Sequence, residues 1–211
     1  MPKHNFPEKI PIFPLSGVVF FPNTTLPLNI FESRYIQLVN DCMKSHKLFG
    51  MVLPKLKKER QTEVYNVGCL GKIVNFSETN DKRFIISLSG IIRFKIEKEL
   101  ENNKLYREFM VDYSYFLNDL EINKEDEKYK NDEIIKMIKM FLSKKNYLVE
   151  IDELKKLNFN QLINNICMVS PFSNEEKQKL IETVKIEDKV KLLRQIIKFS
   201  LHENLESKTI Q

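Results

Sequence analysis

The first half of the chain contains several short stretches in which apolar and polar side chains alternate with a period of two. Residues 91–98 alternate apolar with charged side chains, and residues 108–115 repeat this pattern. Residues 67–76 and 83–88 are two further apolar stretches, and they flank a turn-forming cluster at 79–82. Period-two alternation is typical of half-buried β-strands, and a turn cluster between two such stretches predicts a hairpin.

One segment of this half has a helical period instead. The apolar side chains that recur at helical spacing there are Tyr35, Leu38, Val39, Cys42 and Met43. A further short apolar strand is predicted directly after this helix, at 49–53. The pattern therefore predicts a β-rich lobe that one helix interrupts.

Beyond about residue 117 the apolar residues follow a helical period. Three stripes carry it, formed by Ile134, Ile135, Ile138, Phe141 and Leu142, by Leu162, Ile163, Ile166 and Val169, and by Val190, Leu193, Ile197 and Leu201. Ser173 and Glu176 match a capping box, which predicts a helix that begins there and runs to about Val184.

Glycine and proline are distributed very unevenly between the two halves. All five glycines lie in the first 90 residues, and seven of the eight prolines lie in the first 54. Both residues mark turns and bulges and are excluded from helix interiors. We therefore predict an α+β protein with a β-rich lobe at 1–117, a polar linker at 118–130 and a helical lobe at 131–211.

Charge separates along the same boundary. The chain has a net charge of +5, and residues 1–116 hold 17 Lys+Arg against 12 Asp+Glu, so the whole excess lies on the β lobe. A basic loop runs from Lys55 to Arg60 and includes Lys57 and Lys58. Such a loop offers phosphate contacts to nucleic acid, but no aromatic side chain is interleaved with it for base stacking.

The sequence lacks the common signatures of catalysis. It contains no phosphate-binding loop, no GxSxG or SxxK nucleophile motif and no metal-binding spacing among its three histidines, so we expect no enzyme, no cofactor and no metal. The segment Ser87–Gly90 is interpreted as a turn. The three scattered cysteines indicate buried, reduced thiols. With no signal peptide and no long apolar stretch, we expect a cytoplasmic protein without membrane contact.

The most specific stretch is residues 10–35, IPIFPLSGVVFFPNTTLPLNIFESRY. Prolines interrupt its apolar runs at Pro11, Pro14, Pro22 and Pro27. Because each proline removes a donor from the hydrogen-bond ladder, we expect these strands at sheet edges or bulges. The run then leads into the predicted helix.

This stretch resembles the N-terminal, substrate-binding domain of the Lon protease family. The matching motifs are Pro11, Phe13-Pro14-Leu15, Phe21-Pro22, Pro27-Leu28 and Ile30-Phe31-Glu32-x-Arg34-Tyr35. The stretches VGCLGKIVNF from Val67, GIIRFKI from Gly90 and SPFSNEEKQKLIE from Ser170 also look similar to the family. The resemblance implies a PUA-like pseudobarrel of about six strands followed by a helical bundle. It also implies a stand-alone bacterial member that lacks the ATPase and peptidase domains.

In function, the resemblance implies a non-catalytic module associated with proteolysis that binds unfolded or apolar polypeptide segments or an ATP-dependent protease. Because an alternating apolar run cannot bury every side chain, we expect an exposed binding surface in the N-terminal hairpin, formed by Val19, Phe20, Phe21, Pro22, Leu26 and Arg34. An interlobe groove is the alternative location. We interpret Pro14, Phe31, Glu32 and Tyr35 as structural, with Phe31 and Tyr35 as aromatic core anchors and Arg34 pairing with Glu32 or a strand carboxylate. The alternative function is RNA binding by the basic β lobe.

Overall fold

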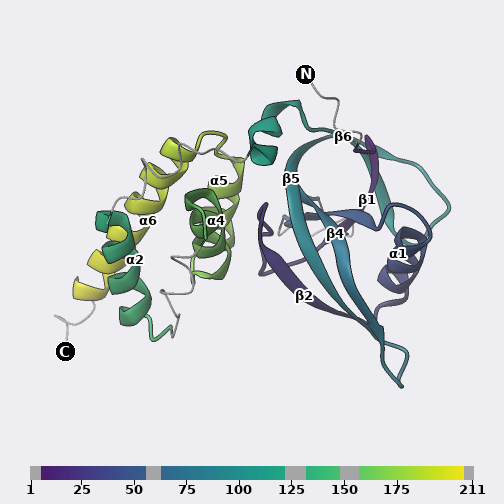
Figure 1. Cartoon of the computed structure of the whole chain (residues 1–211), viewed down its shortest axis with the longest axis horizontal. Helices are drawn as coiled ribbons and strands as arrows, with labels where there is room; N and C mark the ends of the chain where they lie inside the picture. The colour runs from purple at the N-terminus through teal and green to yellow at the C-terminus, as the bar shows by residue number, and fades with distance from the viewer. Residues whose placement is uncertain (1–5, 56–62, 122–131, 148–156, 207–211) are drawn as a thin grey trace. The chain divides into compact units, whose positions relative to one another are not determined.

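The structure is a computed structural model that describes residues 6–55, 63–121, 132–147 and 157–206. The chain divides into two compact units, Met1–Glu121 and Ile122–Gln211. The first contains strands and the second contains helices, so the predicted α+β class is confirmed (Figure 1). Within the described residues, no helix combines the length and the apolar character that crossing a membrane requires.

In residues 6–55 and 63–121, the first unit contains six strands, one α-helix and one 3-10 helix. They are β1 (Lys9–Pro14), β2 (Thr25–Ile30), α1 (Ser33–Met43), β3 (Leu48–Val52), β4 (Val67–Glu78), β5 (Phe84–Leu100), β6 (Arg107–Asp112) and η1 (Ser114–Leu120). The sequence therefore predicts these strands well, except that the stretches at 83–88 and 91–98 form one continuous strand, β5. Ser87–Gly90 consequently lies inside a strand, and its interpretation as a turn is wrong.

The strands form one mixed sheet in the order β2-β5-β4-β3-β1-β6. A further pairing between β5 and β6 closes this sheet on itself, and Figure 1 shows its strands curving around one another. Along one edge of β5 lies β4, whereas the other edge pairs with β2 through residues 84–89 and with β6 through residues 95–100. Strand β5 thus pairs with three other strands, β2, β4 and β6.

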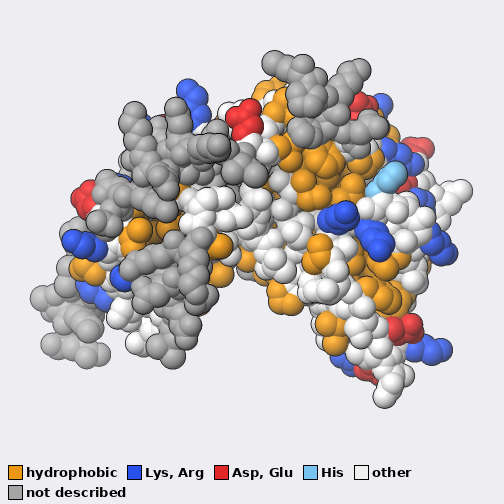
Figure 2. All heavy atoms as spheres, viewed as in Figure 1, with side chains coloured by type: hydrophobic (Ala, Val, Ile, Leu, Met, Phe, Trp, Pro, Cys, Tyr) orange, Lys and Arg blue, Asp and Glu red, His pale blue; other side chains and the backbone are white. Residues whose placement is uncertain are grey.

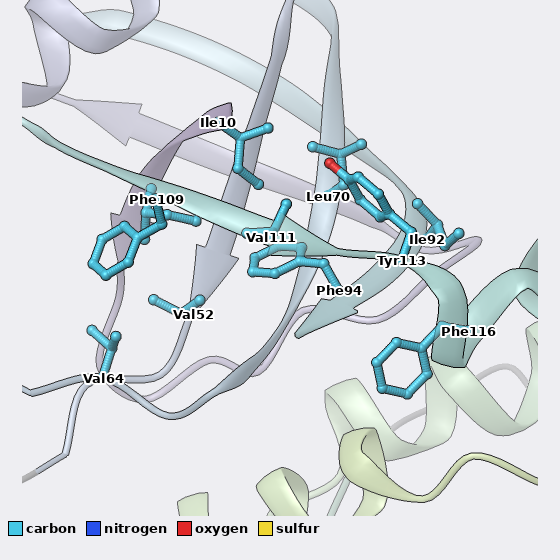
Figure 3. Packing of buried hydrophobic residues seen from close by; sticks show 11 residues of the cluster. Ile10, Val52, Val64, Leu70, Ile92, Phe94, Phe109, Val111, Tyr113 and Phe116 are labelled. Atoms are coloured by element: carbon cyan, nitrogen blue, oxygen red, sulfur yellow. The ribbon is translucent and has the colours of Figure 1, made fainter. Parts of the chain in front are cut away.

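A cluster of apolar side chains fills the inside of this barrel (Figure 3). It draws on β1, β3, β4, β5, β6 and η1, with the members Ile10, Ile12, Val52, Val64, Leu70, Ile92, Phe94, Phe109, Val111, Tyr113 and Phe116. Alternation explains the selection, because every second side chain of a strand points to the same face of the sheet. Burial of these side chains is the main source of stability for the unit.

Strand β1 is not at an edge, although its two prolines predict one. It pairs with β6 through Lys9–Ile12 and with β3 through Ile12–Pro14. The two neighbours therefore share only Ile12, so each proline has a registered partner on one side alone. This arrangement lets a strand with neighbours on both sides contain prolines. Strand β2, which contains Pro27, pairs with β5 alone among the described strands, as expected for an edge.

Strand β6 ends at Asp112, three residues before the predicted end. The Asp112 carboxylate accepts hydrogen bonds from the backbone N–H of Ser114 (2.8 Å) and from its hydroxyl (2.7 Å), which turns the chain into η1. Through η1, residues 118–120 join the first unit rather than the predicted linker. The rest of that linker, residues 122–130, lies outside the described residues.

Helix η1 covers a charged side chain that alternation predicts to face solvent. Arg93 donates to Asp119 from Nε (2.9 Å) and Nη2 (2.7 Å), and its backbone N–H donates to the same carboxylate (3.0 Å). The Arg93 guanidinium also lies over the ring of Phe116, 4.5 Å from its centroid. The pair is buried, so it ties η1 to the middle of β5.

In the part of the second unit that the structure describes, the helices are α2 (Asp132–Lys144), α4 (Phe159–Val169), α5 (Asn174–Glu182) and α6 (Ile186–Glu206). Helix α6 packs against α2, α4 and α5. The predicted capping box of Ser173 and Glu176 is confirmed at the start of α5, and Asn158 with Gln161 forms a second one at α4. Most residues of the predicted helical stripes are buried, whereas Val169 of the second stripe is 42% exposed. Phe141 stacks on Phe172.

Two lysines of this unit are buried and bind oxygen atoms of α4. Lys177 Nζ donates to the carbonyl of Met168 (2.8 Å), and Lys189 Nζ donates to the side-chain oxygen of Asn164 (3.0 Å). Burial lowers the pKa of Lys177, because it penalises the charged form. The helical core therefore combines apolar packing with buried hydrogen bonds.

Candidate functional site

A pocket of about 480 Å³ opens in the first unit and is the candidate functional site. Its walls come from β1, the start of α1, the end of β5 and the start of β6. The lining residues are Ile12, Pro14, Ser16, Arg34, Tyr35, Pro54, Glu99, Leu105, Tyr106 and Arg107. Its volume lies within the range of roughly 300–1,000 Å³ that is usual for ligand pockets. The mixture of apolar walls and charged groups is also typical of binding sites.

Arg34 enters the pocket from the first turn of α1. Its Nε and Nη2 donate to one oxygen of Glu32, at 3.0 and 2.7 Å, and both side chains are exposed. Glu32 occupies the N-cap position of the helix but makes no side-chain capping bond. Of the two partners predicted for Arg34, the structure selects Glu32. This pair holds the guanidinium beside the pocket.

Arg107 enters from the start of β6 and binds a carboxylate of β5. Its Nε and Nη2 donate to the two oxygens of Glu99, at 2.6 and 2.7 Å, in a bidentate pair. The guanidinium lies 4.9 Å from the centroid of the Phe109 ring. Hydrogen bonding from Arg107 lowers the pKa of Glu99, so this carboxylate is ionised at neutral pH. The pocket therefore contains two arginines from elements that are far apart in the sequence.

Tyr35 forms an inner wall of the pocket. Its ring stacks on Phe13 with the centroids 3.9 Å apart, and the guanidinium of Arg34 lies 4.5 Å from the ring centroid. Its hydroxyl donates to the carbonyl of Pro14 at 3.4 Å. Burial raises the pKa of Tyr35, although the charges of Arg34 and Arg107 both act to lower it. Both arginines are therefore close enough to the Tyr35 hydroxyl for their charges to affect its pKa.

A second tyrosine, Tyr106, closes the wall next to Arg107. Its hydroxyl donates to Asp41 at 2.8 Å, and burial raises its pKa to about 12. Next to it, the backbone N–H of Leu105 donates to the side chain of Gln37 (2.8 Å), while the leucine side chain stays 63% exposed. Helix α1 thus fixes the loop that leads into β6 and presents Leu105 to solvent.

A buried carboxylate supports the start of β6. Glu108 binds Lys104 (2.9 Å) and Lys9 (3.1 Å), and its residue is 4% exposed. Burial by itself acts to raise the pKa of Glu108, but the hydrogen bonds from the two lysines outweigh it and the pKa is lowered. Glu108 is therefore ionised at neutral pH and links β1 to the loop before β6.

The expected exposed surface in the N-terminal hairpin is wrong for four of its residues. Val19, Phe20, Phe21 and Pro22 are all buried, and Phe21 has no exposed surface. The segment lies against β5 in the stretch between its β2 and β6 partners, where Asn23 N–H donates to the carbonyl of Gly90 (2.9 Å). The apolar run is therefore part of the barrel core, and its burial removes the reason for placing a binding surface there.

Glycine makes this close approach possible. A Cβ at Gly90 would collide with the carbonyl oxygen of Phe21, so only a residue without a side chain fits. That carbonyl accepts a hydrogen bond from the hydroxyl of Thr24 (2.7 Å). Leu26 on the edge strand β2 is half-buried, and its role in binding stays a prediction.

The interpretation of Phe31 as a core anchor is also wrong. Its side chain is 63% exposed and lies near the guanidinium of Arg83, which is 5.8 Å from the ring centroid. Tyr35 is buried, as expected, and half-buried Pro14 ends β1 beside it. Phe31 therefore belongs to the surface, whereas Pro14 and Tyr35 shape the pocket.

Sequence reasoning did not assign seven of the ten lining residues to a site, and four of these seven lie close together in the chain: Glu99, Leu105, Tyr106 and Arg107. No local pattern marks them, because they lie at and between the ends of two strands. Only Pro14, Arg34 and Tyr35 could be singled out from the sequence, because they belong to the N-terminal signature. The structure thus joins three signature residues with a strand connection some seventy residues later.

Apolar and cationic side chains also adjoin on the surface of the first unit. Figure 2 shows orange side chains gathered around the region of β5 and β6, with blue lysine and arginine side chains nearby. Of the basic loop, Lys55 forms an ion pair with Glu63 at 3.8 Å, while Lys57, Lys58 and Arg60 lie outside the described residues. The interlobe groove, the other predicted location, stays a prediction.

No arrangement for metal binding is found in the described residues, where no group of three or more His, Cys, Asp or Glu side chains is placed to hold an ion. Cys42, Cys69 and Cys167 are buried, and none of these three forms a disulfide. Burial raises the pKa of Cys42 and of Cys167 to about 12, so neither is a thiolate at neutral pH.

Comparison with known proteins connects this geometry to one family. The sequence model described as "ATP-dependent protease La (LON) substrate-binding domain" matches residues 9–198. A Lon protease from Anaeromyxobacter dehalogenans is 24% identical over 203 residues, which covers 92% of this chain and 24% of that protein. One from Malacoplasma penetrans is 28% identical, over 79% of this chain and 22% of that protein. The chain spans about a quarter of the length of these two relatives.

Solved structures show the same fold. A Lon N-terminal domain protein from Xanthomonas campestris has a TM-score of 0.62 at 18% identity, covering 90% of this chain and 97% of that one. The N-terminal domain of a Mycobacterium avium complex Lon protease has a TM-score of 0.66 at 16% identity, covering 90% and 98%. At these identities the likeness concerns the fold alone.

Proposed function

The chain belongs to the family of Lon substrate-binding domains, and we propose that it is a non-catalytic module that binds unfolded or apolar segments of polypeptides. The pocket in the first unit is the observation that carries this proposal. Its apolar residues, among them Pro14, Pro54 and Leu105, are accessible to a ligand, and charged groups stand beside them. Such a surface suits an extended chain with apolar side chains.

An ATP-dependent protease is the partner class that we propose. Its support is the family, since the relatives named above are Lon proteases of which this chain matches about a quarter. In this arrangement the module captures a polypeptide and the protease partner supplies the chemistry. The proposal predicts that the module binds polypeptides without hydrolysing them.

Fluorescence anisotropy of a labelled, permanently unfolded polypeptide tests the proposal. We expect saturable binding that resists moderate salt and an excess of unlabelled RNA. The variant Leu105→Asp places a charge on an apolar wall of the pocket. It should weaken binding roughly tenfold or more, because covering this charge with an apolar ligand costs more than about 1.4 kcal/mol. Wild-type affinity in this variant would show that the pocket is not the site.

A matched control is available in the same unit. Leu117, in η1, is also exposed and does not line the pocket. Leu117→Asp therefore introduces the same charge at a similar surface position, and we expect it to bind the polypeptide as the wild type does. Because both leucines are exposed, neither change should alter the free energy of unfolding by more than about 0.5 kcal/mol.

RNA binding has weaker support at this pocket. Base recognition uses open aromatic faces, but Phe13 and Arg34 occupy the ring of Tyr35, and Tyr106 is buried with Lys104 5.0 Å from its ring centroid. Displacement of the polypeptide by RNA, together with a steep fall of affinity with salt, would favour the RNA alternative over the proposed function.

A further inference from the structure

The pocket combines two features that point to one kind of ligand. Its accessible apolar wall includes Pro14 and Pro54, and its charged part includes Arg34 and Arg107. A guanidinium recognises planar, anionic oxygen pairs, because its N–H donors form a fork that matches a carboxylate. A ligand that satisfies both parts has a carboxylate next to an apolar group.

The two arginines are oriented before any ligand arrives. Glu32 binds Arg34 through Nε and Nη2, and Glu99 binds Arg107 through the same two nitrogens. A guanidinium has five N–H donors, so in Arg34 the bonds to Glu32 leave the donors of Nη1 for a ligand. Orientation by existing ion pairs reduces the entropy that binding loses.

We propose that the pocket binds the C-terminal residue of a polypeptide, with its α-carboxylate on Arg34 and Arg107 and its apolar side chain against Pro14 and Pro54. This inference rests on the proposed function and adds which part of the polypeptide is bound. In a polypeptide, the α-carboxylate of an apolar last residue lies one carbon from that side chain. Such a residue presents both groups together.

The remaining charges favour a carboxylate over a phosphate group. Glu99 lines the pocket and is ionised, so a ligand with two negative charges meets stronger repulsion than one with a single charge. The aromatic rings of this pocket are covered by Phe13, Arg34 and Lys104, which leaves no platform for a base. A nucleotide therefore fits the pocket less well than a chain end does.

Two labelled decapeptides of the same sequence, which ends in leucine, test the inference by fluorescence anisotropy. One has a free C-terminal carboxylate and the other a C-terminal amide. We expect the amide to bind at least roughly tenfold more weakly, because it loses the charge-assisted hydrogen bonds to Arg34 and Arg107. Equal affinities would overturn the inference, whereas binding of both peptides would still support the proposed function. Binding of neither peptide would contradict both.

Variants of Arg34 locate the effect. In Arg34→Gln, the free-carboxylate peptide should bind roughly tenfold more weakly than to the wild type, because only Arg107 still binds its carboxylate, and the affinity of the amide should stay unchanged. Arg34→Lys keeps the charge without the fork and should give an intermediate affinity. The control is Arg83→Gln, another exposed arginine that pairs with Asp81 and lies outside the pocket lining, which should retain the wild-type preference.

A competitor distinguishes the two anion classes. A short RNA should leave the bound free-carboxylate peptide in place. If RNA displaces the peptide from the wild type but not from Arg34→Gln, the pocket binds phosphate groups, and the inference would be overturned. Thermal unfolding of each variant confirms the fold, and an unchanged Tm is expected because the Arg34–Glu32 pair is exposed.

Discussion

Two arginine–carboxylate pairs share strand β5 and differ in their surroundings. Arg93, in the middle of the strand, binds Asp119 with side chains that are 3% and 9% exposed. Glu99, near its end, binds Arg107 with side chains that are 48% and 34% exposed. A buried charge depends on its partner, whereas an exposed pair contributes little to folding. The buried Arg93–Asp119 pair therefore stabilises the fold, whereas the exposed Arg107–Glu99 pair places charged groups in the pocket.

Removing one half of the buried pair should have the largest effect. In Asp119→Ala the carboxylate that binds Arg93 is lost while the guanidinium remains under η1. We expect the free energy of unfolding to fall by about 3–5 kcal/mol, measured by urea denaturation with circular dichroism. A double variant, Arg93→Met with Asp119→Leu, should recover most of this loss. A double variant as unstable as Asp119→Ala would mean that packing, and not the buried charge, explains the loss.

The buried carboxylate of Glu108 should give an intermediate effect that depends on pH. The pKa of Glu108 is about 4.3 in the unfolded chain and is lowered in the folded state. This difference stabilises the fold at neutral pH. This contribution is lost as the pH falls from about 4.3 through the folded-state pKa. Glu108→Gln should unfold about 1–3 kcal/mol more easily at pH 7, and this difference should shrink in acid.

Urea titrations between pH 7 and pH 3 measure this effect. Glu101→Gln, on the exposed side of the same connection, is the control and should follow the wild type at every pH. A constant difference between Glu108→Gln and the wild type over the whole range would contradict the electrostatic explanation.

The exposed pair should show the opposite balance between stability and binding. In Arg107→Gln we expect a loss of about 0–1 kcal/mol in the free energy of unfolding, because both side chains are in contact with water. Affinity for the free-carboxylate peptide should nevertheless fall roughly tenfold. A large loss of stability without a loss of affinity would place this pair in the same class as Arg93–Asp119.

The smallest effect is expected at Phe31. Because this ring is mostly exposed, Phe31→Ser should change the free energy of unfolding by no more than about 0.5 kcal/mol. Tyr35→Ala, four residues later and buried, should remove about 3–5 kcal/mol in the same urea experiment. Equal losses at the two positions would mean that Phe31 supports the fold after all.

Periodicity predicted the elements well because it depends on neighbours in the sequence. The alternation in 91–98 and the helical stripe of α1 both appear where expected. The capping box of Ser173 is likewise local, since its donor and acceptor are three residues apart. The N-terminal signature added the family and three residues of the pocket. These features need no knowledge of distant strands.

Several of the errors concern contacts between distant segments. Val19 to Pro22 is an apolar run whose burial depends on its place against β5, between the stretches of that strand that pair with β2 and with β6. Arg93 and Asp119 lie in different elements, and charged residues carry no periodic signal that pairs them. Arg107 lines the same pocket as Arg34 because the start of β6 lies near α1, to which Tyr106 and Leu105 are hydrogen-bonded. The partner of a charged side chain that lies far away in the sequence is therefore identified only from the structure.

The shared position of β5 also has a consequence for the order in which the barrel folds. Strands β4 and β5 are joined by a tight turn, in which Thr79 N–H donates to the carbonyl of Arg83 (2.9 Å), so their pairing closes a short loop and should form early. Strand β1 is synthesised before the other strands of the barrel, but its pairing with β6 must wait until residues 107–112 have been made. Pulse-labelled amide exchange should detect protection in 67–95 before Lys9–Pro14, and simultaneous protection would contradict this order.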